Sequence, residues 1–439
     1  MNIDFGSDWI TKSWNLYING ECISDFEIPN SVTDINPYAF YCCSSIKSLK
    51  ISNSVTSIGY HAFYYCKNLN KIEFESTESL WNIDFGSEWL FEKWGSKEWN
   101  LYINGECIAD LEVPNSVTDI DPDTFNGCKS LISLKISGSV TSIGDQAFAN
   151  CINLHKIEFE SIESLFNIKF GASWKYVKSG GWDLYIGSQL ISDLEIPNSA
   201  SELENIFMHC MSLESVKIPE TICKIGKFAF YDCKCLKSVD IPESVTEICD
   251  YAFDTCRDLD VKLPSKLSVI GTHAFSYCWN ASETLDIPES VVSIGSNSFY
   301  NYSKLKWLKL PTNIAEIGSQ AFDNCFAIKT VEYMSENPCT APDNIFLNST
   351  YSNATLYIPA GTTDKYMETQ PWKNFKNIVE VQLTGIDEIS EDNSEDGIDY
   401  SAPYEVYNFT GLKLNDTVDQ LQPGLYIIRQ GNTTQKLKL

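Results

Sequence analysis

Residues 139–159 read SVTSIGDQAFANCINLHKIEF, and this stretch decides the fold because its pattern recurs along most of the chain. The pattern is V-x-x-I-G-x-x-A-F-x-x-C-x-x-L-x-x-I-x-I-P, and its period is about 23 residues. Its phenylalanines are Phe40, Phe63, Phe125, Phe148, Phe207, Phe230, Phe253, Phe275, Phe299 and Phe322. One such repeat cannot bury its own apolar side chains, so the repeats must stack on one another. The sequence therefore predicts a solenoid and not an ordinary globular core.

Each repeat ends in L-x-x-I-x-I followed by proline, which predicts a short strand. In one repeat Leu213, Val216 and Ile218 are expected to face inward, and Pro219 ends the strand. Gly226 predicts a tight turn into the next segment. We expect a leucine-rich repeat solenoid with a parallel β-sheet on its concave side, short helical or irregular segments on its convex side, β-hairpin insertions and a small C-terminal β module.

Nine of the 16 cysteines fall in one slot of the repeat. They are Cys43, Cys66, Cys128, Cys151, Cys210, Cys233, Cys256, Cys278 and Cys325. Neighbouring members would lie about 5 Å apart with parallel side chains, a geometry that suits a disulfide poorly. We therefore expect a ladder of buried thiols. Cys22 and Cys107 align with Leu190, so they too are expected to be apolar filler.

A longer period of about 80–85 residues is superimposed on the short one. The sequence NIDFGS at 2–7 returns at 82–87, and NIKFGA follows at 167–172. Because the first copy has nothing upstream, we expect the chain to begin inside a structural unit. Each long unit is interpreted as two short repeats and an insertion with a hairpin. Its turn is Asn-Gly in the first two copies, and Gly187-Ser188 suggests a Gly-first turn in the third.

The repeats resemble those of BspA-like bacterial surface proteins with leucine-rich repeats. The residues that carry the resemblance are the S-V-T-x-I-G-x-x-A-F-x-x-C-x-x-L units, such as the one from Ser244 to Leu259, and the L-Y-I-N-G-E segments. It covers about residues 1–380. Cys249 in place of the usual glycine and Tyr302 in place of the ladder cysteine depart from the pattern. The resemblance implies a secreted or cell-surface protein that adheres to host matrix or mucosal proteins.

The sequence predicts four regions: the solenoid at 1–333 with three hairpin and tryptophan-rich insertions, a C-terminal cap at 334–382, an acidic linker at 383–402 and a β module at 403–439. The linker is expected because seven acidic residues lie between Gly385 and Ser401 without a basic one. The module resembles the C-terminal sorting domains of secreted Bacteroidetes proteins in Tyr407-Asn408, Pro423-Gly424 and Tyr426-Ile427. That resemblance implies export across the outer membrane.

The composition and motifs of the chain argue against several classes of function. Lys and Arg number 32 against 59 Asp and Glu, for a net charge of -27, and so acidic a chain should repel nucleic acid and anionic membranes. No apolar run approaches the roughly 18 residues of a membrane helix. The chain contains no H-E-x-x-H, C-x-x-C, Walker or G-x-S-x-G motif, so we expect no enzyme, cofactor or metal.

The sharpest pattern is a row of charges at the central outward position of each strand. In order the row is Glu27, Lys50, Glu73, Glu112, Lys135, Glu158, Glu195, Lys217, Asp240, Lys262, Asp286, Lys309 and Glu332. The signs alternate except where an insertion brings Glu73 to Glu112 and Glu158 to Glu195. Opposite charges on adjacent strands should pair. The row either sets the strand register or binds a ligand, and we place a special surface first at the two like-charge joins.

Tryptophan is the second candidate. Trp89 and Trp174 occupy equivalent positions in the insertions, as do Trp99 and Trp182, while Trp94 lies between them. They form either small satellite cores or an exposed aromatic surface that stacks on sugars. Trp307 is the lone aromatic residue in the row beside the charges. The leading hypothesis is a non-catalytic extracellular scaffold for a protein or glycoprotein partner, and the alternative is a glycan-binding protein.

Overall fold

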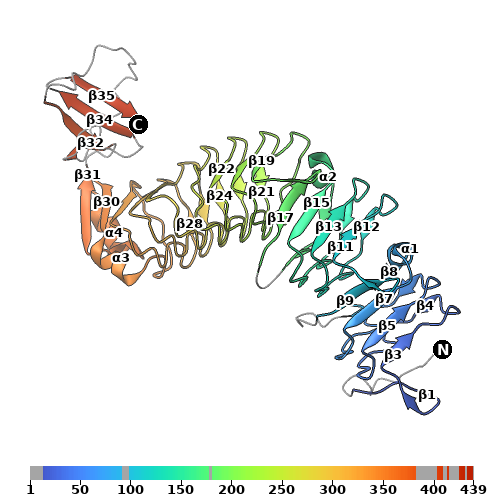
Figure 1. Cartoon of the computed structure of the whole chain (residues 1–439). Helices are drawn as coiled ribbons and strands as arrows, with labels where there is room; N and C mark the ends of the chain where they lie inside the picture. The colour runs from blue at the N-terminus through green and yellow to red at the C-terminus, as the bar shows by residue number, and fades with distance from the viewer. Residues whose placement is uncertain are drawn as a thin grey trace. The chain divides into compact units, whose positions relative to one another are not determined.

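The computed structural model describes residues 13–90, 98–176, 180–381, 403–408, 413–414, 425–430 and 433–438. The chain forms two compact units, Met1–Ala281 and Ser282–Leu439, and each is described by itself. In both units short parallel strands stack at a spacing of about 23 residues, which confirms the predicted leucine-rich repeat solenoid (Figure 1).

The first unit contains three blocks, at residues 13–108, 109–191 and 192–281, each with its own main sheet (Figure 1). The main-sheet strands of the first block are β3 (Asp25–Glu27), β5 (Ser48–Ile51), β7 (Lys71–Phe74) and β9 (Asn100–Ile103). Those of the second block are β11 (Asp110–Glu112), β13 (Ser133–Ile136), β15 (Lys156–Phe159) and β17 (Asp183–Ile186). The third block has β19 (Asp193–Glu195), β20 (Ser215–Lys217) and β22 (Ser238–Asp240).

A second row of two-residue strands runs beside each main sheet. It consists of β4 (Asp34–Ile35), β6 (Ser57–Ile58) and β8 (Asp84–Phe85), then β12 (Asp119–Ile120), β14 (Ser142–Ile143) and β16 (Lys169–Phe170), then β21 (Lys224–Ile225), β23 (Glu247–Ile248) and β24 (Val269–Ile270). Two short helices, α1 (Thr77–Trp81) and α2 (Ile162–Phe166), begin at serine capping boxes directly after β7 and β15.

The predicted insertions are themselves turns of the solenoid. Strand β9 pairs in parallel with β7, and β8 pairs with β6, so the segment that contains LYI completes a coil. The same holds for β17 beside β15 and β16 beside β14. The interpretation of this segment as an insertion between repeats is therefore wrong. Its sequence diverges from the repeat, but it keeps the alternation of apolar residues that faces the core.

The core is built from ladders of identical side chains. Phe40 and Phe63 stack at 5.0 Å with ring planes 3° apart, and the nine ladder cysteines are buried free thiols, as predicted. Several thiols also donate a hydrogen bond to a phenylalanine carbonyl of the preceding coil, such as Cys151 Sγ to Phe125 O at 3.0 Å. The repeat thus uses cysteine as a donor as well as an apolar filler.

The segments that join the two rows of strands are successive turns. Most coils place two residues at positive φ there, as Gln146 and Asn150 do at 55° each. Gly226 was expected to serve a tight turn, but its φ is not positive. A Cβ at Gly226 would instead lie 2.9 Å from the Cβ of Glu204 in the preceding coil. The signature glycine is therefore required by close stacking of neighbouring coils.

One antiparallel hairpin lies at the start of the first block, and one lies at the end of each of the first two blocks. They join β1 (Tyr17–Ile18) to β2 (Glu21–Cys22), β9 to β10 (Glu106–Cys107) and β17 to β18 (Gln189–Leu190). Both turn residues have positive φ in all three hairpins, including Gly187 at 51° and Ser188 at 70°, so the different turn predicted for the third copy is wrong. Cys22, Cys107 and Leu190 are exposed and not buried filler, because β2, β10 and β18 are terminal strands.

The main sheet breaks at each of the two internal hairpins. Strand β10 covers the open edge of β9, so β11 starts a new sheet, and β18 does the same before β19. The core nevertheless continues across the first break. The rings of Trp81 and Phe125 lie 5.5 Å apart, Trp99 Nε1 donates to Asn126 O at 2.8 Å, and Leu101 N donates to Ser130 Oγ at 2.9 Å.

The second unit continues the repeat. Its main sheet is β25 (Thr284–Asp286), β27 (Trp307–Leu310), β29 (Thr330–Tyr333), β30 (Thr355–Pro359) and β31 (Asn377–Val381), with β26 (Ser293–Ile294) and β28 (Glu316–Ile317) beside it. Residues 334–381 add α3 (Asn348–Asn353), α4 (Thr363–Glu368) and the 3₁₀ helix η2 (Trp372–Asn374). Here Trp372 is buried against Tyr333, with ring centroids 4.7 Å apart.

Four antiparallel strands form a separate sheet near the C-terminus. They are β32 (Glu405–Asn408), β33 (Lys413–Leu414), β34 (Leu425–Gln430) and β35 (Thr433–Lys438), in the order β33-β32-β34-β35. The acidic segment expected at 383–402 and Pro423-Gly424 of the proposed sorting module lie outside the described residues.

Candidate functional site

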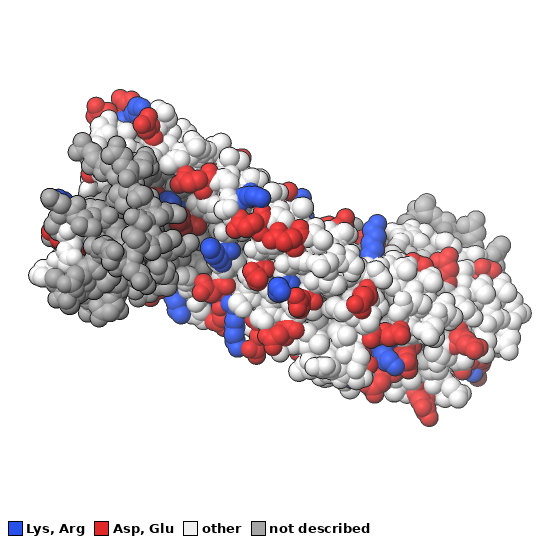
Figure 2. All heavy atoms as spheres, turned by 90° about the horizontal axis from the view of Figure 1, so that it is seen from above, with Lys and Arg blue, Asp and Glu red and all other residues white. Residues whose placement is uncertain are grey.

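The charged row lies on the outer face of the main sheets and pairs as predicted. Lys50 Nζ lies 2.8 Å from Glu27 Oε1, and the equivalent pairs in the next two blocks, Lys135–Glu112 and Lys217–Glu195, are 2.8 and 2.7 Å apart. In the second unit Lys309 lies 3.2 Å from Asp286. Acidic side chains lie beside basic ones over much of the face seen in Figure 2. Four of the five lysines in the row are therefore neutralised by the carboxylate of the strand before.

In each block of the first unit, the pairing has one direction. The lysine reaches back to the carboxylate of the strand before it, and its hydrogen bond to that carboxylate raises the pKa of Lys135 and of Lys217. In the first two blocks the carboxylate of the third strand bonds to a lysine of its own strand instead. Glu73 lies 2.8 Å from Lys71, and Glu158 lies 3.3 Å from Lys156.

The expected like-charge joins do not form. Tyr102 on β9 is the register partner of Glu73, and Tyr185 on β17 is the partner of Glu158, so a tyrosine stands between each pair of carboxylates. The ammonium of Lys71 lies 4.5 Å from the centre of the Tyr102 ring, within the range of a cation–π contact. The prediction that Glu73 meets Glu112 and that Glu158 meets Glu195 is wrong, because the supposed insertion supplies a strand.

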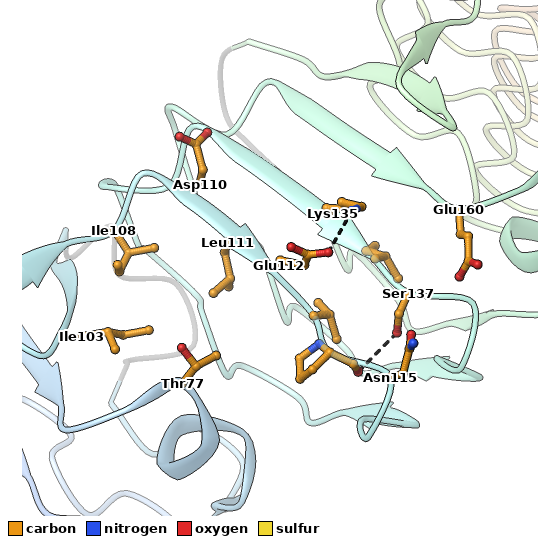
Figure 3. Close-up of a pocket in the computed structure, with 13 residues that line it drawn as sticks. Thr77, Ile103, Ile108, Asp110, Leu111, Glu112, Asn115, Lys135, Ser137 and Glu160 are labelled. Atoms are coloured by element: carbon orange, nitrogen blue, oxygen red, sulfur yellow. Dashed lines mark hydrogen bonds and ion pairs between the residues drawn. The ribbon is translucent and has the colours of Figure 1, made fainter.

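A groove of about 690 Å³ lies at the first break, between the β9–β10 hairpin and β11, and Figure 3 shows the residues that line it. Ile103 and Ile108 line it from the hairpin, and Thr77 lines it from the start of α1. The opposite side is β11 and the residues after it, with Lys135 and Glu160 beyond. The groove contains two of the predicted site residues, Glu112 and Lys135.

Strand β11 presents an edge to this groove. Its only paired neighbour among the described strands is β13. Ser133 N donates to Ala109 O, and Val113 N donates to Lys135 O at 2.8 Å, so the odd-numbered residues of this segment bond to β13. Because backbone direction alternates along a parallel strand, the N–H and C=O groups of Asp110 and Glu112 point to the opposite edge.

The sequence around this edge is repeated. Each block begins its main sheet with Asp-apolar-Glu, at Asp25–Glu27, Asp110–Glu112 and Asp193–Glu195, and a lysine follows on the next strand. A second hollow of about 550 Å³ lies over β19, β20 and β22 and contains Glu195 and Lys217. The break before β19 has no hairpin residue in the lining of that hollow.

The tryptophans of the long units do not form an exposed surface. Trp89, Trp99, Trp174 and Trp182 are at most 1% exposed, so none offers a ring face to a sugar. They pack in pairs, with Trp89 6.3 Å from Trp99 and Trp174 5.8 Å from Trp182. The four tryptophans are buried, but in the continuous core and not in separate satellite cores, since Trp89 contacts Phe63 and Trp174 contacts Phe148. These four are removed from the candidate binding surface. Trp94 lies outside the described residues.

Trp307 belongs to the second unit and is half-buried on β27. Its Nε1 donates to Glu332 Oε1 at 2.6 Å. Glu332 is 1% exposed, and its burial raises the pKa of the carboxyl group to about 7. Trp307 is therefore a partner of a buried carboxyl group on the outer face.

Sequence reasoning missed the hairpin side of the groove, including Ile103 and Ile108, and it missed the backbone edge at Asp110. A signal for the breaks was present. The coil after each hairpin carries Cys-x-Ser, at Cys43, Cys128 and Cys210, and that serine accepts the N–H of the leucine that enters the hairpin coil. The next coil in each of the first two blocks carries Cys-x-Asn there, with Asn68 and Asn153.

The site formed by the described residues is a groove that can bind another chain. No cluster of three His, Cys, Asp or Glu side chains suited to a metal ion occurs among them. Within the same ranges, every helix is too short or too polar to cross a bilayer. The groove supplies backbone groups, apolar side chains and carboxylates, which together can hold another chain.

Comparison with known proteins agrees with this architecture. The profile of the BspA type leucine rich repeat region, in six copies, matches residues 13–89, 99–180, 201–285 and 279–394. A leucine rich cell surface protein from Faecalibacterium prausnitzii has a similar structure, with a TM-score of 0.50 and 21% identity over 72% of this chain and 88% of that one. A leucine-rich repeat protein from Bacteroides ovatus is 24% identical over 73% of this chain and 84% of that one, with a TM-score of 0.42. No curated protein matches the sequence.

Proposed function

Because the chain belongs to the BspA-type leucine-rich repeat family, we propose that it is a non-catalytic scaffold that holds a protein partner on the outer face of its main sheets. Members of this family are typically secreted or displayed on the cell surface, and we place the chain there. The adhesion target is a protein or glycoprotein of the extracellular matrix or a mucosal surface.

One observation carries the proposal. The outer face of the first unit combines an ordered row of ion pairs with a groove at a sheet break, and the groove contains part of that row. Exposed ion pairs contribute little to stability, roughly 0–1 kcal/mol each, so stability alone does not require three copies of the same pair. Paired charges at fixed spacing give a partner a defined pattern to match, and charge patterns of this kind set specificity and association rate.

The test is binding of the full chain to a panel of purified extracellular-matrix and mucosal glycoproteins. Lys217→Glu should weaken capture at least about tenfold, because it places two carboxylates opposite each other on the outer face. Lys224→Glu is the matched control. Lys224 pairs with Glu247 at 2.9 Å and is similarly exposed, but it lies on the second row of strands.

The panel also distinguishes a protein-binding scaffold from the alternative, a glycan-binding protein. Each glycoprotein is tested before and after enzymatic removal of its sugars. Binding that survives deglycosylation and falls with Lys217→Glu supports the proposal. Binding that disappears with the sugars would favour a glycan receptor, and equal loss in Lys217→Glu and Lys224→Glu would show that the outer face has no special role.

A further inference from the structure

The groove at the first break has a free strand edge along one wall. Asp110 and Glu112 direct their backbone N–H and C=O groups away from β13, toward the side on which the groove lies. An edge of this kind is a template for another extended chain, which gains main-chain hydrogen bonds by adding itself as a strand. Natural sheets cover or blunt such edges, but here β10 pairs with β9 and not with β11.

The wall opposite β11 and the floor are apolar. Ile103 and Ile108 of the hairpin coil are half-buried, and Leu111, Val113 and Ile136 lie beneath the strand. Successive side chains of an added strand point to opposite faces, so every second residue would meet this apolar lining. The lining therefore favours an extended segment with apolar residues at alternate positions.

The charges of the groove favour a basic segment. Its charged side chains are Asp110, Glu112, Glu160 and Lys135. Glu112 holds Lys135 at 2.8 Å, and Glu160 Oε2 accepts from Gly138 N at 2.7 Å. Three carboxylates against one ammonium leave the groove negative, and a hollow lined by one sign of charge concentrates ligands of the opposite sign.

We infer that the groove between the β9–β10 hairpin and β11 takes an extended segment of the protein partner, with alternating apolar and basic residues, as an added strand against β11. The inference deepens the proposed function and rests on it, because the segment belongs to the same partner. It names the chemistry of that partner: an exposed basic strand or tail, and not a folded acidic surface.

The experiment measures binding of a synthetic peptide of about eight alternating lysine and valine residues to the full chain by calorimetry. A second peptide has the same sequence with N-methyl groups on alternate amides, which removes the N–H groups of one edge. A third replaces lysine by glutamate. We expect binding only of the first, and we expect its affinity to fall as salt rises.

The protein variant is Glu112→Pro, which removes the N–H that points to the groove and leaves the bonds from Ala109, Leu111 and Val113 to β13 in place. Proline is tolerated on such an edge. We expect about tenfold weaker peptide binding from the loss of one hydrogen bond and one carboxylate. Glu195→Pro at the equivalent edge of β19 is the control and should bind the peptide as the native chain does. Urea denaturation verifies that both variants fold.

The outcomes are distinct. Equal binding of the N-methylated peptide, equal affinity of Glu112→Pro, or equal losses in both proline variants overturns the inference. Self-association of the chain that Glu112→Pro abolishes also overturns it, because the occupant is then a second copy. If a matrix protein still binds and responds to Lys217→Glu while the peptide does not bind, the inference fails and the proposed function stands. If no panel protein binds but the peptide does, the reverse holds.

Discussion

Lys175 occupies a position that an apolar side chain fills in equivalent coils. Phe125 N donates to Ala147 O, and Phe148 N donates to Trp174 O at 2.8 Å, so Lys175 stands where Phe148 stands one coil earlier. The corresponding residue in the first block is Leu90, which follows Trp89. Lys175 is fully buried, and its ammonium group donates a hydrogen bond to Cys151 O at 3.3 Å.

The free-energy cost of burying the charged ammonium group follows from the pKa of Lys175. Burial lowers the pKa of Lys175 from 10.5 to about 8. Since each pKa unit corresponds to about 1.4 kcal/mol, burial of the charged form costs about 3 kcal/mol at neutral pH. We expect Lys175→Leu to raise the free energy of unfolding by about that amount at pH 7, because leucine fits the same position in the first block.

The pH dependence has a definite sign. Below pH 8 the lysine is charged in both states, and the cost is complete. Between pH 8 and 10.5 the native chain has lost the proton that the unfolded chain retains, so native-chain stability rises with pH. The advantage of Lys175→Leu should therefore fall to less than half by pH 9.5.

The assay is urea denaturation followed by tryptophan fluorescence at pH 7.0, 8.5 and 9.5, with the midpoint and the slope both fitted. Lys169→Leu is the matched control, since Lys169 is exposed on β16 of the same coil. A gain that is the same at every pH, or a loss of stability in Lys175→Leu, would refute the reasoning from charge burial.

Two further outcomes follow from buried groups. Glu332→Gln should stabilise the chain at pH 8 by about 3 kcal/mol and have no effect near pH 4.5. Burial raises the pKa of Glu332 from 4.5 to about 7, so native-chain stability falls as pH rises through that range. Denaturation at both pH values checks this, with exposed Glu336→Gln as control. A thiol reagent should label the exposed cysteines of the folded chain, Cys22, Cys107, Cys223 and Cys235. The nine ladder cysteines should react only after unfolding, because burial raises the pKa of their thiols, that of Cys128 to about 11. Peptide mapping that finds early modification of Cys151 would contradict the buried ladder.

The fold could be predicted because its physical cause is local and repeated. Each coil shows its inward residues in the sequence, so the positions of Phe148, Cys151 and Ile157 fix a strand and its neighbours. The charged row was predictable for the same reason, since strand alternation places Glu112 and Lys135 on one face. Their contact follows from the register.

The groove could not be predicted because it arises where the repeat departs from its pattern. Because Tyr102 fills the place of a charged residue, the sequence pattern predicts an insertion in that coil and predicts that the charges on either side meet. Whether a hairpin strand covers an edge or leaves it open depends on how β10 packs, which no residue spacing records. The burial of Trp89 was open for a similar reason: an indole suits a core as well as a surface.

The hairpin that ends each of the first two main sheets also sets the length of the segment that can be duplicated or lost without breaking a sheet. Loss of a single coil, such as the one that contains Lys50, would place Glu27 beside Glu73 and remove the Lys50–Glu27 pair of that block. Gain or loss of a whole block of about 80–85 residues preserves the pairs of the remaining blocks, because the first two main sheets each start with Asp-apolar-Glu and end at their own hairpin. Length variation among natural variants of this chain should therefore occur in steps of one block.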